Sequence, residues 1–103
     1  MNVIAELTVV PIGVGTSLSK YVAVCKKILV EAGLTVQLHA NGTNVEGAWN
    51  AVFAAIKRCH EEIHELGAPR IHTSIKVGTR TDREQTIADK VQSVESKLGA
   101  PAK

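Results

Sequence analysis

Two short segments of the chain alternate polar with apolar side chains, and their polar members are rich in hydrogen-bonding groups. The segments cover residues 35–40 and 71–77. Successive side chains of a strand point to opposite faces, so the polar members share one face of each strand. They are Gln37, His39, His72, Ser74 and Lys76. This mixture of amide, imidazole, hydroxyl and ammonium groups indicates a recognition surface for a small polar ligand, with a wet sheet face or a polar subunit interface as the alternative.

The segment from His60 to His64 matches the zinc-protease pattern H-E-x-x-H. In that chemistry both imidazoles bind zinc and Glu61 activates a water molecule. The context disfavours it, because His60 falls within the apolar stripe of its expected helix, between Ile56 and Ile63. We therefore expect a partly buried, structural His60, and a zinc protein that uses His60 and His64 is kept as a minor alternative.

A glycine-rich loop, Gly13–Ser17, joins the first expected strand to the first expected helix. Backbone N–H groups at a helix start attract anions, so the loop predicts a phosphate or sulfate contact near Thr16 and Ser17. The dinucleotide pattern G-x-G-x-x-G fails because residue 18 is Leu. The loop therefore indicates an anion contact and a hydroxyl cap for the helix, and it disfavours a nucleotide-binding fold.

Glu46 stands at the end of a short expected strand, just before a helix. By alternation from Val45, its carboxylate points to the polar face of the sheet. A negative charge near a helix N-terminus is favourable in itself. The same carboxylate is also suited to accept hydrogen bonds from an amino-substituted ring, so the structural and the ligand-binding roles both stay open.

The loop from Gly78 to Gln85 is a run of charged residues, and such runs are usually solvated. Thr81 and Glu84 have the spacing of a capping box for a following helix. The functional alternative is that Arg80 or Arg83 reaches a neighbouring subunit.

The composition limits the class of protein. The chain has 103 residues, is 45% hydrophobic and carries a net charge of +2, which suits one domain over residues 1–103 without a basic footprint for nucleic acid. Glu6 and Pro11 interrupt the first apolar run, so neither a signal peptide nor a membrane span is expected. Cys25 and Cys59 lie in helical patterns and are expected to be buried free thiols in a reducing cytoplasm.

The periodicities predict the order β-α-β-β-α-β, followed by a C-terminal helix that ends at Gly99. An Asn41-Gly42 turn, in which both residues tolerate positive φ, is expected between the second and third strands. The expected strands are residues 2–12, 35–40, 43–46 and 70–77, and the first two helices are residues 18–32 and 48–66. This order is typical of an α+β, ferredoxin-like fold, in which two helices cover one face of a four-stranded antiparallel sheet.

The other face of that sheet is expected to stay open. The C-terminal helix is extra to the fold, and its apolar stripe of Ile87, Val91, Val94 and Leu98 must be buried on the open face or on another subunit. Unpaired sheet edges also invite pairing, so a homo-oligomer is expected. The open face is predicted to carry Glu6, Thr8, Gln37, His39, His72, Ser74 and Lys76.

Several short motifs then occur as an ordered set over roughly residues 3–98. With this set the chain resembles the small thiamine-binding (YkoF-like) protein family. The motifs are Val9–Gly13, Ser17-Leu18-Ser19, Leu38-His39, Gly42-Thr43, Glu46-Gly47, His72-Thr73 and Val77–Arg80.

The resemblance implies ferredoxin-like subunits that form dimers with extended sheets, and dimers that pair into tetramers. It also implies binding of thiamine or its hydroxymethylpyrimidine portion near subunit interfaces, with no catalysis and no cofactor. The family's site carries over to the segment Gly42–Gly47 and to the strand from His72 to Lys76. A structural or regulatory homo-oligomer with no small-molecule ligand is the alternative.

The chemistry of such a ligand suits the open face. Its aminopyrimidine presents a donor and ring acceptors, and its thiazolium is a permanent cation that carboxylates attract. Lys76 would disfavour that cation but would suit a phosphate ester. The expected ligand-binding residues are Glu6, Thr16, Ser17, Gln37, His39, Thr43, Glu46, Ser74 and Lys76.

Overall fold

A computed structural model describes residues 1–99 of the chain. Its elements follow in the predicted order, and their bounds differ from the expected ones by no more than two residues. They are β1 (Asn2–Ile12), α1 (Ser19–Glu31), β2 (Thr35–His39), β3 (Gly42–Ala48), α2 (Trp49–Glu65), β4 (Arg70–Gly78) and α3 (Ile87–Gly99). None of the helices in this described part of the chain is long and apolar enough to cross a membrane.

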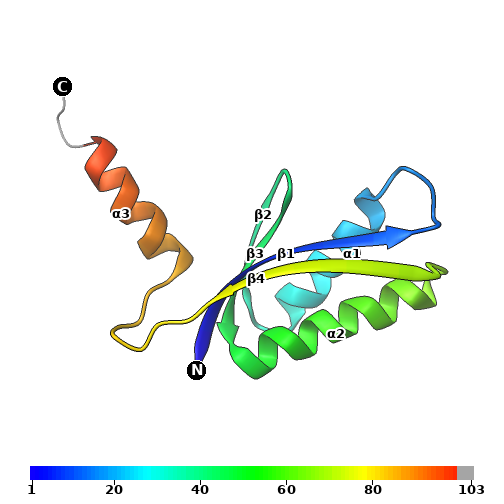
Figure 1. Ribbon diagram of the computed structural model, residues 1–103, viewed down its shortest axis with the longest axis horizontal. Coiled ribbons are helices and arrows are strands. Elements are labelled where there is room, and N and C mark those ends of the chain that lie inside the picture. Colours follow the sequence, from blue (N-terminus) through cyan, green and yellow to red (C-terminus); the bar gives the residue numbers. More distant parts are fainter. Residues whose placement is uncertain (100–103) are drawn as a thin grey trace.

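The four strands form one antiparallel sheet in the order β2-β3-β1-β4 (Figure 1). β1 is central, because it pairs with β3 over residues 2–7 and with β4 over residues 4–12. Two strands that follow each other through α1, namely β1 and β2, are therefore separated by β3. This is the split βαβ arrangement, and the predicted ferredoxin-like α+β fold is confirmed.

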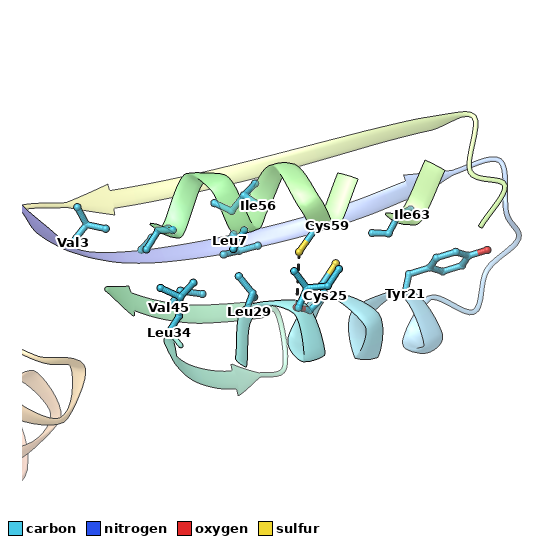
Figure 2. Packing of buried hydrophobic residues seen from close by; sticks show 14 of the residues in the cluster. Val3, Leu7, Tyr21, Cys25, Leu29, Leu34, Val45, Ile56, Cys59 and Ile63 are labelled. Carbon is cyan, nitrogen blue, oxygen red and sulfur yellow. Dashed lines mark hydrogen bonds between the residues drawn. The ribbon is translucent and has the colours of Figure 1, made fainter. Parts of the chain in front are cut away.

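α1 and α2 pack against one face of the sheet, the covered face, and close the hydrophobic core (Figure 2). β1 directs Val3, Ala5 and Leu7 to this face, where each is 2% exposed. Leu29 of α1 and Val45 of β3 are 0% exposed. Burying an aliphatic side chain of this size stabilises a fold by about 1.5–3 kcal/mol, so the covered face holds much of the folding free energy.

Both core helices end at a glycine in the left-handed region. Gly33 has φ +82° and Gly67 has φ +108°, values that a side chain disfavours. Around Gly33 the backbone N–H of Leu34 donates to the carbonyl of Leu29, and that of Gly33 donates to Val30. This double hydrogen bond is the Schellman ending, and it turns the chain from α1 into β2.

The hairpin between β2 and β3 is present, but the expected turn is wrong by one residue. His39 pairs with Gly42, so the turn residues are Ala40 and Asn41. Among residues 1–99, only glycines adopt a positive φ, and Gly42 is not one of them. Gly42 is needed for close approach instead, since a Cβ there would lie 2.9 Å from the carbonyl oxygen of Leu7.

Two expected helix caps are also wrong. α1 begins after Leu18 with no side-chain cap, so the hydroxyl of Ser17 does not cap it. The capping box of α3 is formed by Thr86 and Asp89, whose side chains each accept from the other's backbone N–H at 3.0 Å. Thr81 and Glu84 have a similar spacing but precede the helix by too many residues.

α3 stands apart from the compact body (Figure 1). Ile87, in its first turn, is its buried residue. Val91, Val94 and Leu98 are exposed by 47%, 58% and 72%. The predicted helix is therefore present, and its first turn lies over one end of the open face while most of its apolar stripe has no cover from this chain.

Candidate functional site

The face opposite α1 and α2 is the open face, and its side chains lie in rows across neighbouring strands. The strand register confirms the polar alternation that the sequence predicts. One row contains Gln37, Asn44, Glu6 and Lys76, and the row beside it contains Thr35, Glu46 and Ile4. Side chains directly opposite on neighbouring strands interact, so the register fixes which predicted site residues meet.

Glu6 is the centre of a charged cluster on the open face. Its carboxylate lies 3.1 Å from Nε2 of His39 and 4.0 Å from Nζ of Lys76. Nδ1 of His39 accepts from the backbone N–H of Asn41 at 3.4 Å, so the proton of the neutral ring sits on Nε2 and is donated to Glu6. Three of the predicted site residues thus satisfy one another.

Gln37 and Glu46 occupy the neighbouring part of the open face. The Oε1 atom of Gln37 accepts from the side-chain amide of Asn44 at 2.9 Å, which fixes the orientation of both amides. One carboxylate oxygen of Glu46 accepts from the backbone N–H of Ile87 at 3.3 Å. Glu46 therefore joins the sheet to the first turn of α3, and its other oxygen has room to accept further donors.

A groove of about 390 Å³ runs between the open face and α3, and we call it the α3 groove. Its polar wall comes from the sheet and its mainly apolar wall comes from α3. A binding site for a small organic molecule usually combines an apolar wall with a few placed polar groups. The lining residues are Thr35, Gln37, Glu46, Ile87, Ala88, Val91 and Gln92.

A second hollow of about 520 Å³, the end cleft, lies where β1 begins and β4 ends. It shares Thr35 and Glu46 with the α3 groove, so the two hollows adjoin. The loop between β4 and α3 supplies Arg80 and Arg83, and α3 supplies Lys90. The end cleft is thus the more cationic of the two.

Arg80 holds the loop beside the end cleft in shape. Its guanidinium pairs with Asp82 through two nitrogens, and Nη1 donates to Gln85 at 2.8 Å. This hydrogen-bonded pair lowers the pKa of Asp82 from 3.8 to about 2. Hydrogen bonds from Thr86, and to a lesser degree the charge of Arg83, lower the pKa of Asp89.

Three predicted site residues lie elsewhere. Thr43 pairs with Leu7 and is 8% exposed on the covered face, so its placement on the open face is wrong. The reason is parity, because Thr43 and Val45 are two positions apart and share a face. Thr16 and Ser17 are exposed in the loop after β1. This loop follows the end of β1, whereas Glu46 pairs with Ile4 near its start, and the two residues line neither hollow.

Ser74 and Lys76 lie on the open face as predicted, but they line neither hollow. The side chain of Lys76 is 89% exposed, and its Nζ lies 4.0 Å from the carboxylate of Glu6. Lys76, which would suit a phosphate ester, therefore lies outside both hollows.

The two imidazoles of the H-E-x-x-H segment bond to different parts of the fold. Nε2 of His60 lies 2.6 Å from the hydroxyl of Thr73, and Nδ1 of His64 lies 2.8 Å from the carbonyl of Ala68. Within residues 1–99, no three His, Cys, Asp or Glu side chains are grouped to hold a metal ion. His60 thus ties α2 to β4.

Cys25 and Cys59 are free, buried thiols on facing helices (Figure 2). The Sγ atom of Cys59 donates to the carbonyl oxygen of Cys25 at 3.8 Å. The hydrogen bond with Cys59 and burial raise the pKa of the Cys25 thiol far above its ordinary value. Because a thiol reacts through its thiolate form, Cys25 is inert as a nucleophile.

The sequence was compared with families of known proteins. The family described as "Thiamine-binding protein" matches residues 5–95. The chain belongs to this family. A UPF0045 protein of Synechocystis sp. is 61% identical over 98 residues, which cover 95% of this chain and 81% of that protein. The UPF0045 protein ECM15 of Eremothecium gossypii is 42% identical, with 95% and 94% of the two chains covered.

Solved structures of similar proteins share the fold. A hypothetical protein of Methanocaldococcus jannaschii superposes with a TM-score of 0.84 at 32% identity, over 90% of this chain and 95% of the other. A Thermotoga maritima protein, described as a candidate thiamine biosynthesis/salvage protein, has a TM-score of 0.78 at 18% identity, over 91% and 99%. The second likeness concerns the fold alone.

Sequence reasoning missed several residues that line the hollows. Thr35 follows the same alternation as Gln37, so the alternation alone is enough to predict that Thr35 lies on the open face. For Arg83 the sequence offers a contact with a neighbouring subunit as one alternative, and it gives no signal for Lys90. No local period places these two side chains at the same hollow as Glu46, because their position depends on the path of the loop after β4 and on the placement of α3.

Proposed function

We propose that this protein binds thiamine or its hydroxymethylpyrimidine portion, without catalysing a reaction on it. The observation that carries the proposal is Glu46, a carboxylate on the open face that lines both adjoining hollows. Membership of the thiamine-binding family supports the choice of ligand. The family name does not select a site, so the residues of the site rest on the geometry.

The α3 groove has the chemistry that an aminopyrimidine needs. The free oxygen of Glu46 is placed to accept from the exocyclic amine, and Gln37 and Gln92 offer amides for the ring nitrogens. Ile87 and Val91 offer an apolar surface for the flat ring. The permanent positive charge of a thiazolium is then attracted by the carboxylate of Glu46.

The proposal includes a homo-oligomer, a dimer of dimers. The exposed apolar residues of α3, together with Ile75 and Val77 on the edge strand β4, are 36–72% exposed in the single chain. β2 and β4 are edge strands of the sheet, and unpaired edges favour association. A second subunit that covers α3 would also close the α3 groove.

Calorimetric titration of the protein without a His tag tests the proposal, with thiamine and hydroxymethylpyrimidine as ligands. We expect saturable binding and at least tenfold weaker binding for Glu46→Gln, a loss of about 1.4 kcal/mol. Glutamine keeps an oxygen for the N–H of Ile87, so the variant removes the charge while α3 keeps its hydrogen bond.

Glu61→Gln is the matched control, because Glu61 is exposed on α2. The variant also removes the carboxylate that would activate water if the H-E-x-x-H segment were a zinc-protease site. Its affinity should stay within about twofold of the wild-type value. Equal affinities for the wild type and Glu46→Gln would remove Glu46 from the site. If the wild type binds neither ligand, the structural or regulatory oligomer becomes the better description, and substitution of His72 or Lys76 should then dissociate it.

A further inference from the structure

The two hollows meet at Thr35 and Glu46, on either side of the contact between the sheet and the first turn of α3. Because the hollows share these two lining residues, a ligand seated beside Glu46 in the α3 groove also lies next to the end cleft. The groove and the cleft, at about 390 and 520 Å³, both fall in the size range of small-molecule sites. What the second hollow accepts depends on its charges.

The end cleft carries unequal charges. Arg80, Arg83 and Lys90 are its cationic side chains, and Glu46 and Glu84 are its acidic ones. Arg80 is already committed to Asp82 and Gln85.

Arg83 and Lys90 are the other two cations of the cleft, and the charge of Arg83 also acts on the carboxylate of Asp89. In the described part of the chain, neither of them forms an ion pair with a carboxylate. They approach the cleft from two different segments, the loop after β4 and α3. Two cations that converge on a cleft from separate segments fit an anion with several oxygens better than they fit a neutral group.

We infer that the end cleft is a phosphate subsite, so that the preferred ligand is a phosphate ester of the pyrimidine-containing vitamin and not the free alcohol. This inference rests on the proposed function, because it assumes that the ring occupies the α3 groove. Arg83 and Lys90 bind the phosphate oxygens. Glu46 lies between the two hollows, beside the position of the thiazolium cation.

The pattern of charges matches such an ester along its length. The ligand places a neutral ring, a cation and an anion in sequence. The protein places amides and an apolar wall, then Glu46, then Arg83 and Lys90 in the same sequence from groove to cleft. Lys76, which would also suit a phosphate ester, lies outside both hollows.

The test compares thiamine, thiamine monophosphate and inorganic phosphate by calorimetry at low ionic strength. We expect the monophosphate to bind at least tenfold tighter than thiamine, and the advantage to shrink as salt is raised. In the double variant Arg83→Gln, Lys90→Gln, the two vitamin forms should bind within about twofold of each other. Thiamine itself should bind this variant no more weakly than it binds the wild type.

The control is Lys26→Gln, Lys27→Gln on the exposed side of α1, which changes the net charge equally and should keep the preference. Equal binding of both forms by the wild type would overturn the phosphate subsite and leave the proposed function standing. A preference that survives in the Arg83, Lys90 variant would overturn it too. Inorganic phosphate that binds as tightly as the ester would show that the ring adds nothing, and would overturn the ester as the preferred ligand. If neither vitamin form binds, the proposed function and the subsite both fail.

Discussion

On the covered face of the sheet, Val3 and Leu7 of β1 are 2% exposed, whereas their neighbours Ile4 and Glu6 on the open face are only half-buried. The same strand thus serves a dry core and a surface with two hollows. α1 and α2 bury their apolar stripes on the first side, and α3 leaves most of its stripe uncovered on the second. Alternate side chains of one strand thus serve stability on one face and the two hollows on the other, so substitutions on the two faces should have different consequences.

The largest effect is expected from a matched pair of leucines. Leu29→Ala, in α1, removes a side chain that is 0% exposed and should lower the free energy of unfolding by about 3 kcal/mol. Leu98→Ala, in α3, removes one that is 72% exposed and should change it by less than about 0.5 kcal/mol. Urea denaturation followed by far-UV circular dichroism measures both.

The dependence of these stability losses on protein concentration distinguishes the two leucines further. If α3 is covered by a second copy, Leu98→Ala should become more costly as protein concentration rises, since association stabilises the folded state. Similar losses for the two variants at every concentration would show that the two sides do not differ in the way proposed.

A smaller effect is expected from two consecutive residues of β4. Thr73→Val removes the hydroxyl that lies 2.6 Å from His60 on the covered face and should cost about 1 kcal/mol. Ser74→Ala, on the open face, should stay within about 0.5 kcal/mol of the wild type. Thermal unfolding of the two variants under one set of conditions gives the comparison, and a larger loss for Ser74→Ala would reverse the assignment of the two faces.

The smallest effect concerns the loop beside the end cleft. The Arg80 guanidinium holds the pKa of Asp82 at about 2 instead of 3.8. The pairing therefore stabilises the folded state above about pH 4, and this stabilisation is lost as the pH falls towards 2. Arg80→Gln should raise the pKa of the Asp82 carboxyl towards its ordinary value, because the largest cause of the shift is removed. An NMR titration of the Asp82 side chain between about pH 1.5 and 6 covers both midpoints, and an unchanged midpoint in the variant would exclude Arg80 as the cause.

The fold could be predicted because its elements have strong local periods. Alternation fixed β1 and the polar face of β4, and apolar stripes fixed α1 and α2. The Asn41-Gly42 turn was misplaced because the close approach of Gly42 to Leu7 selects glycine for a reason other than its φ. A composition that fits a turn does not show which position in the turn it occupies.

The candidate site was predicted only in part. Gln37 and Glu46 line a hollow, and Glu6 and His39 lie on the expected face, since each follows the parity of its strand. Thr43 was assigned against that parity. Arg83 could not be placed at the same hollow as Glu46 from the sequence, because the path of the loop after β4 is a tertiary property.

The attachment of α3 through Ile87 and Glu46 has a dynamic consequence. A helix of 13 residues is marginally stable by itself in water, and beyond its first turn α3 has little else to hold it. The amide hydrogens of α3 should therefore exchange with solvent through local opening. The free energy of this opening should be a small fraction of the one that protects the core strands. Whatever fills the α3 groove or covers its apolar stripe will slow that exchange, which makes α3 an internal reporter of occupancy.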